Sequence, residues 1–166
     1  SHSYSTVGYS WVNCSRTGWG SGSDDGYATV SIGFNFPFYG NSYSTTHIST
    51  NGFLGFGSTA SMTDYSPDAI PNTRNPDNIV APLWTDLNPR RGGSVWYCRT
   101  NAYGQQALVV NWDNVPYYYN TGSNRFQAVL LANGEIRFNY DRVNSYRTYT
   151  TGVENQNGTI GTQVWR

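Results

Sequence analysis

The residue types that perform catalysis are scarce in this chain, and they are not spaced as an active site requires. A nucleophilic triad needs a base beside Ser or Cys, but His47 lies in an expected strand, where a histidine is more typical of a structural hydrogen bond. Glycosidases need two opposed carboxylates; Glu135 lies beside an expected turn, and nothing in the sequence pairs Glu154 with Asp86. Hydrolase, zinc-protease and phosphate-loop motifs are absent from the sequence. We therefore expect a protein that is not an enzyme, because a small hydrolase would lack its residues.

One stretch combines aromatic rings with the polar groups that sugars require. Sugars present CH faces that stack on aromatic rings, and hydroxyls that bond to amides, carboxylates and guanidinium groups. Because alternate side chains in an extended segment face opposite ways, three successive tyrosines cannot all enter one core. The stretch is therefore either a sugar platform or the cover of a sheet edge, and Trp19 is a second candidate exposed ring. The candidate ligand-binding residues are Trp19, Asp113, Asn114, Tyr117, Tyr118, Tyr119, Asn120 and Arg125.

Side chains suited to calcium occur at three places in the sequence: Asp24-Asp25, Asp64 with Asp68, and Asp86 with Asn88. Calcium accepts carboxylate, carbonyl and amide oxygens at flexible spacing, and Asp24, Asp25 and Asp86 could supply them. The alternative is that Asp24 or Asp25 caps a turn while Asp86 accepts hydrogen bonds from backbone amides. A structural calcium ion is the one cofactor that the sequence suggests.

The two cysteines, Cys14 and Cys98, cannot form a four-ligand zinc site by themselves, and neither histidine has metal-ligand spacing to them. They form either one disulfide or two buried thiols. By the chain-entropy estimate, a bridge between them would stabilise the fold by about 4–5 kcal/mol. A bridge would also place the protein outside the cytosol.

The composition of the chain narrows the classes of protein to which it can belong. The 166 residues fit one domain, with 12% charged and 16% aromatic residues, a profile that indicates an all-β extracellular module. Because the formal net charge is zero, a nucleic-acid partner is not expected. No apolar run is long enough for a membrane span. The beginning, Ser1-His2-Ser3, is typical of an excised piece, so we expect residues 1–166 to be a single module of a larger secreted protein.

Short period-two runs separated by turn residues predict an antiparallel β-sandwich, jelly-roll or Ig-like, with little or no helix. The clearest run, RFQAVLLANGEIRFNY, predicts a hairpin around Asn133-Gly134 with one face buried and the other wetter. The irregular stretch 57–78 contains three prolines and is long enough to be functional. The expected strands are 27–34, 47–56 (broken at Asn51-Gly52), 79–84, 95–99, 107–112, 125–131, 135–140, 151–154 and 161–165.

Five short segments occur in an order that points to one family. FPFYG, STNGFLGFG, IVAPLWTDLNP, RFQAVLLANGEIRFNY and TGVEN resemble the nidogen-like extracellular domain and the related β-sandwich modules of plexin-domain-containing proteins, over residues 24–154. The resemblance implies a non-catalytic part of a secreted or cell-surface protein that serves adhesion, matrix contact or substrate targeting. The Cys14–Cys98 pair and the run Tyr117–Tyr119 depart from the family pattern. Together with the tyrosine-rich stretch, this resemblance leads us to expect a module that binds glycan. A protein-binding or matrix-adhesion module is the alternative.

Overall fold

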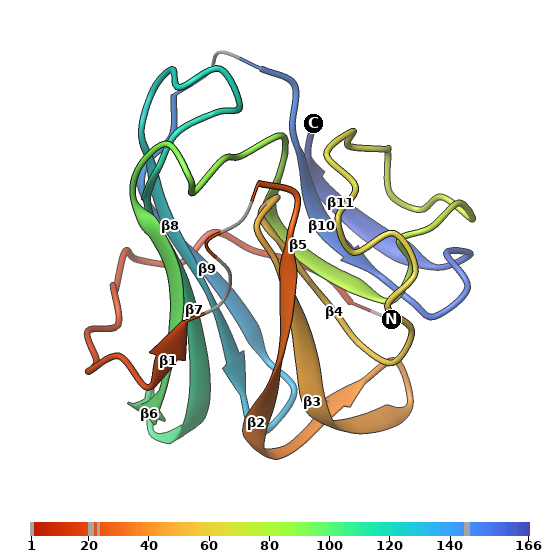
Figure 1. Ribbon diagram of the computed structural model, residues 1–166. Coiled ribbons are helices and arrows are strands. Elements are labelled where there is room, and N and C mark those ends of the chain that lie inside the picture. Colours follow the sequence, from red (N-terminus) through yellow and green to blue (C-terminus); the bar gives the residue numbers. More distant parts are fainter. Residues whose placement is uncertain (1, 20–21, 23, 145–146) are drawn as a thin grey trace.

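The chain forms two antiparallel β-sheets packed face to face, in a computed structural model that describes residues 2–19, 22, 24–144 and 147–166 (Figure 1). The described residues contain no helix, and the predicted all-β antiparallel sandwich is confirmed. The five-stranded sheet has the order β1 (Gly18–Trp19), β6 (Ser94–Ala102), β7 (Gln105–Val115), β8 (Asn124–Leu131) and β9 (Ile136–Arg142). The six-stranded sheet has the order β11 (Gly161–Trp165), β10 (Thr150–Glu154), β5 (Ile79–Trp84), β4 (Phe53–Gly55), β3 (Asn41–Ser49) and β2 (Tyr27–Phe38).

The main core lies between the two sheets and follows the period-two pattern of the sequence. Trp112 of β7 and Phe126 of β8 are cross-strand neighbours and stack with their ring centroids 5.0 Å apart. From the other sheet, Phe36 and Phe38 pack against Phe56. Alternation places these rings on the inner faces, where their burial supplies the main stabilising free energy.

The expected strand 47–56 is two strands rather than one. Thr50–Gly52 turn the chain, and Ile48 of β3 then pairs with Leu54 of β4. Gly52 has a φ of 83° and approaches the Leu83 carbonyl so closely that a Cβ atom would overlap it. The Asn51-Gly52 break is thus a hairpin turn locked against β5, consistent with the positive φ that only glycine adopts readily.

The prediction of a wetter outer face on the hairpin 125–140 was wrong for its first strand and for Asn139 of its second, because the N-terminal segment covers that face. Val129 and Leu131 are fully buried in a cluster that includes Val12 and the bridged Cys14 and Cys98. Gln127 is also buried; its side-chain amide bonds to both the N–H and the carbonyl of Val12, at 2.9 and 3.2 Å. The outer face of the five-stranded sheet is therefore a second, smaller core.

Residues 57–78 cover the outer face of the six-stranded sheet in the same way. Met62 and Ile70 from this stretch pack on Phe53 and Trp84, and the Trp84 indole N–H donates to the Asp64 carbonyl at 3.1 Å. The long proline-containing stretch is thus an ordered cover. Because both outer faces carry cover, most of the exposed aromatic side chains lie on the covers and at the ends and edges of the sandwich.

Candidate ligand-binding end of the sandwich

Three connections meet at one end of the sandwich: the turn before β2, the segment that follows β5, and the loop between β7 and β8 (Figure 1, top). We call this region the tyrosine end and define it by Asp24, Asp25, Asp86, Tyr118 and Tyr119. Most of the sequence-predicted site residues lie in these connections or next to them.

The β7–β8 loop divides the three tyrosines between the core and the surface. Tyr117 is fully buried, its hydroxyl donates to the Asn144 carbonyl, and its backbone forms a bridge with Leu87. The side chains of Tyr118 and Tyr119 are exposed, with fractional exposures of 41% and 73%. Their rings meet edge to face, 4.9 Å between centroids. The two outer tyrosines are thus available to a ligand, whereas Tyr117 anchors the loop and cannot contact one.

Backbone hydrogen bonds fix this loop to the segment after β5. The Tyr118 N–H donates to the Asp86 carbonyl at 3.0 Å, and the Asn88 N–H donates to the Pro116 carbonyl at 2.9 Å. Within the loop, the Asn120 N–H donates to the Tyr117 carbonyl at 2.9 Å, and Asn120 adopts a φ of 61°. Asn120 therefore shapes a tight turn that presents Tyr118 and Tyr119.

Asp113, Asn114 and Arg125 are engaged by other residues of the protein. Asp113 accepts from the Arg125 guanidinium at 3.1 Å and from the Trp96 indole at 3.2 Å. The Asn114 side-chain carbonyl accepts from Arg142. These polar groups link the end of β7 to β8 and β9. Sequence proximity had placed them with the tyrosines as one site.

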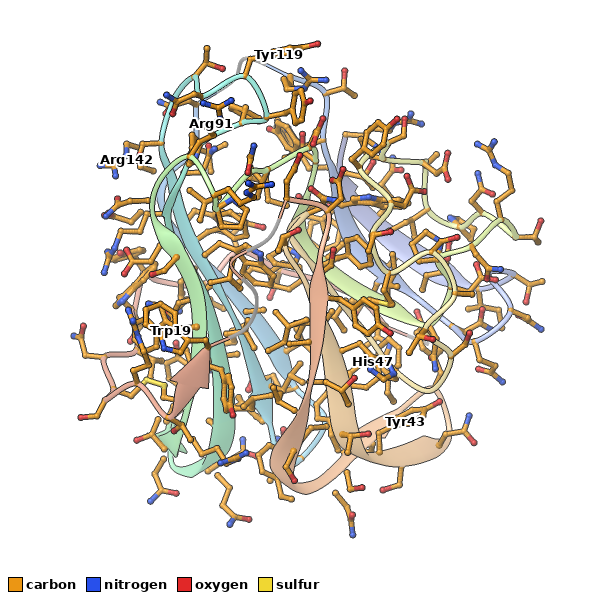
Figure 2. All side chains as sticks on the ribbon, in the orientation of Figure 1. Trp19, Tyr43, His47, Arg91, Tyr119 and Arg142 are labelled. Atoms are coloured by element: carbon orange, nitrogen blue, oxygen red, sulfur yellow. A yellow bond between two sulfur atoms is a disulfide. The ribbon has the colours of Figure 1, made fainter. Side chains whose placement is uncertain are left out.

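Trp19 lies away from the tyrosine end, at the left of the view and well below Tyr119 (Figure 2). Its ring is 62% exposed, and the Arg16 guanidinium lies 3.8 Å above it and 5.0 Å from the Trp96 ring. On the far side of Asp113, the Arg125 guanidinium lies 4.2 Å from the Trp11 ring. Trp19, Arg16, Trp96, Asp113, Arg125 and Trp11 thus form a continuous series, the tryptophan–arginine ladder.

The ladder was not anticipated from the sequence. The sequence feature that could have indicated it is Trp96, two residues before Cys98, because this spacing places both side chains on one face of β6. The Cys14–Cys98 disulfide, with the two Cα atoms 6.2 Å apart, brings the N-terminal segment and its tryptophans onto that face. The expected disulfide is present.

Asp24, Asp25 and Asp86 converge at the tyrosine end, with one carboxylate oxygen from each within 4.8 Å of the others. Burial, followed by the charge of Asp25, raises the pKa of Asp86 to about 6, although Arg147 acts in the opposite sense. Burial and the neighbouring Asp25 also raise the pKa of Asp24. Like charges held this close disfavour ionisation, so the cluster is electrostatically costly as it stands.

A second carboxyl pair, Asp77 and Glu154, lies under the 57–78 cover and was not anticipated either. Glu154 is 2% exposed and accepts the Asn72 N–H at 2.7 Å. Burial is the main cause that raises its pKa to about 8, and a hydrogen bond to Asp77 adds to the effect. The pair holds the cover against β10, and its enclosure does not suit hydrolysis of a bound substrate.

His47 has a structural role, as expected for a strand histidine. Its Nδ1 lies 2.8 Å from the Thr29 hydroxyl, and its Nε2 lies 2.8 Å from the Gly57 carbonyl. Both ring nitrogens are therefore used within the fold.

The fold and its surface define a disulfide-tied β-sandwich module that presents aromatic rings at one end and along one face. The chain belongs to the NIDO-related family, whose sequence profile matches residues 2–164. The predicted resemblance to nidogen-like domains is thereby confirmed. Membership indicates an extracellular module with a non-catalytic matrix or protein-interaction role.

A curated relative is the Dendrite extension defective protein 1 of Caenorhabditis elegans, 27% identical over 144 residues. The match covers 70% of this chain and 12% of the relative, so the chain spans about an eighth of that protein's length. No solved structure matches the chain. Among the described residues, no helix has the length and apolar character needed to cross a bilayer.

Proposed function

We propose that this domain is a non-catalytic adhesion module that binds carbohydrate with Tyr118 and Tyr119. The observation that carries the proposal is the pair of adjacent, exposed rings on a loop fixed by backbone hydrogen bonds. Their edge-to-face arrangement offers two differently oriented faces to the CH groups of a sugar. Because the loop is already ordered, little conformational entropy is lost on binding.

Guanidinium groups suited to sugar hydroxyls lie at the same end of the molecule as these rings. The Arg147 guanidinium lies 5.8 Å from the Tyr119 ring, and Figure 2 places Arg91 and Arg142 at the same end. Arg91 and Asn120 are exposed. Planar guanidinium groups can donate two parallel hydrogen bonds, which suits vicinal hydroxyls and also the carboxylates of acidic sugars.

The test is a glycan array followed by calorimetric titration with the glycans that bind. Tyr119→Ala should weaken binding at least tenfold, because it removes the most exposed ring of the pair. Tyr4→Ala is the matched control: Tyr4 is 60% exposed but lies in the N-terminal segment, away from the loop. Equal affinity for the wild type and Tyr119→Ala would contradict the proposed site.

Protein binding is the second candidate, favoured by the tryptophan–arginine ladder. Trp and Arg are the residues most enriched at the energetic centres of protein interfaces, and Trp19 is 62% exposed. If the partner is a protein, Trp19→Ala should reduce binding to immobilised purified matrix proteins, whereas Tyr119→Ala should leave it unchanged. The reverse pattern, or no binding by the wild type, would contradict this candidate.

A further inference from the structure

The three aspartates of the tyrosine end have the composition and burial of a cation site. One oxygen from each carboxylate lies within 4.8 Å of the other two. Asp86 is 6% exposed, and its Oδ1 has no hydrogen-bond partner among the described residues. Asp24 Oδ1 is likewise buried without a partner there. Buried carboxylate oxygens without donors are costly, and a cation would satisfy both.

Positive side chains near the cluster do not balance it. Arg147 approaches Asp86 Oδ2 at only 3.9 Å, and 37% of its side chain is exposed. Arg90 acts on Asp24 electrostatically, but it is exposed. Two solvated guanidinium groups at this range compensate weakly for three close carboxylates.

A neighbouring amide holds the cluster in place. The Asn51 Nδ2 donates to Asp25 Oδ1 at 2.9 Å and to the Thr63 carbonyl at 3.1 Å. The Asn51 Oδ1 accepts the Leu87 N–H at 3.0 Å. Asn51 therefore connects the turn before β2 with the segment that carries Asp86. Such outer partners orient the ligands of metal sites.

We propose that Asp24, Asp25 and Asp86 bind one calcium ion. The donors are all oxygen, which suits a hard cation, and they come from irregular segments rather than from an octahedral frame. Calcium accepts six to eight oxygens in flexible geometry, whereas magnesium requires a near-ideal octahedron and keeps most of its water. Water would complete the coordination, since Asp24 and Asp25 are partly exposed.

Calcium binding would further stabilise the loop that presents Tyr118. The Asp86 carbonyl accepts the Tyr118 N–H at 3.0 Å, so an ion that fixes Asp86 also stabilises this hydrogen bond. Hydrogen exchange at the Tyr118 amide should therefore slow when calcium binds.

The test uses protein freed of metal with EDTA and titrated with calcium chloride alone. Calorimetry should show one site per chain. At 5 mM calcium, the melting temperature should rise by about 5–8 °C, given an affinity at the tighter end of the range typical of extracellular modules and the size of the domain. Asp86→Asn and Asp25→Asn should each weaken calcium binding at least tenfold. Asp141→Asn, which changes a carboxylate paired with Arg125 outside the cluster, should respond like the wild type.

The melting temperature in the absence of metal distinguishes two roles of Asp86, as a cation ligand or as a purely structural carboxylate. In EDTA, Asp86→Asn should melt at or above the wild-type temperature, because the substitution relieves repulsion; a structural carboxylate would instead lower it. The proposal is overturned if calcium produces no heat and no thermal shift, or if Asp86→Asn responds like the wild type. An equal response to magnesium would overturn the choice of calcium. None of these readouts uses a glycan, so they are independent of the proposed glycan binding.

Discussion

Tyr117 and Tyr118 are adjacent in sequence, yet alanine at the two positions should have opposite effects. Tyr117 is fully buried in the main core, so Tyr117→Ala should cost about 3–5 kcal/mol of the free energy of unfolding. For a domain of 166 residues this corresponds to a fall in melting temperature of about 6–20 °C. Tyr118 is 41% exposed and Tyr119 is 73% exposed, so alanine at either position should cost less than about 1 kcal/mol.

Tyr117→Phe separates packing from hydrogen bonding at the buried position. It keeps the ring and removes the hydroxyl that donates to the Asn144 carbonyl, so it should cost about 1 kcal/mol, or roughly 2–4 °C. Thermal and chemical denaturation of the four variants provide the measurements. A fall for Tyr118→Ala as large as that for Tyr117→Ala would refute the division of the loop into an anchor and an exposed pair. Glycan binding should follow the reverse order, since Tyr118→Ala removes a contact ring without disturbing the core.

Two further predictions concern links that are distant in sequence. The Cys14–Cys98 bridge spans a sequence separation of 84 residues, so replacing both cysteines by alanine should lower the free energy of unfolding by about 4–5 kcal/mol, measured by chemical denaturation; an unchanged midpoint would contradict this role. Burial raises the pKa of Glu154 to about 8, so the folded state holds a proton that the unfolded state releases near its ordinary value. Stability should therefore fall as pH rises from 5 to 8, on the order of 1–2 kcal/mol after allowance for solvent screening at the partly exposed Asp77. Thermal denaturation across that range should show a smaller decline for Glu154→Gln; parallel curves for the two proteins would argue against the protonated pair.

The sequence was sufficient to predict the strands whose alternation is clean. Leu108, Val110 and Trp112 all face the main core, as their spacing required. The strand β1 could not be predicted, because Gly18 and Trp19 form only two residues of ladder and depend on β6 for their pairing. This strand forms only because the N-terminal segment lies beside β6, and the local sequence pattern does not predict where that segment lies.

Polar residues misled the prediction of the outer face. Gln127, Asn111 and Asn139 have the polarity of solvent-facing positions, yet all three are buried. The Gln127 Nε2 donates to Asn111 Oδ1 at 2.9 Å, and the Asn139 Nδ2 donates to Gln127 Oε1 at 2.8 Å. Buried amides are tolerated when they are hydrogen-bonded, and these partners come from three different strands. A linear sequence does not reveal which amides will meet.

Only part of the candidate site could be predicted, again because the sequence does not show which residues meet in space. Alternation correctly required at least one exposed tyrosine, but it could not say which one, because the loop leaves the regular period after Val115. Asp113 and Arg125 were grouped with the tyrosines by proximity in sequence. Their pairing across β7 and β8 instead places them in the ladder, next to Trp96.

The two covers explain where a ligand can bind on this sandwich. A bare sheet face could offer a broad platform, but the N-terminal segment and residues 57–78 each cover part of one outer face. Exposed rings then remain where strands turn, as at Tyr118 and Tyr119, or where a cover crosses a sheet edge, as at Trp19. At the β7–β8 loop, a buried tyrosine anchors the chain, and the Asp86 carbonyl accepts the hydrogen bond of the next residue. Since aromatic groups that are held in place lose less entropy on binding, the loop supports the proposed contact with a small saccharide, and the ladder, with its exposed Trp19 and its arginines, supports the proposed contact with a protein partner.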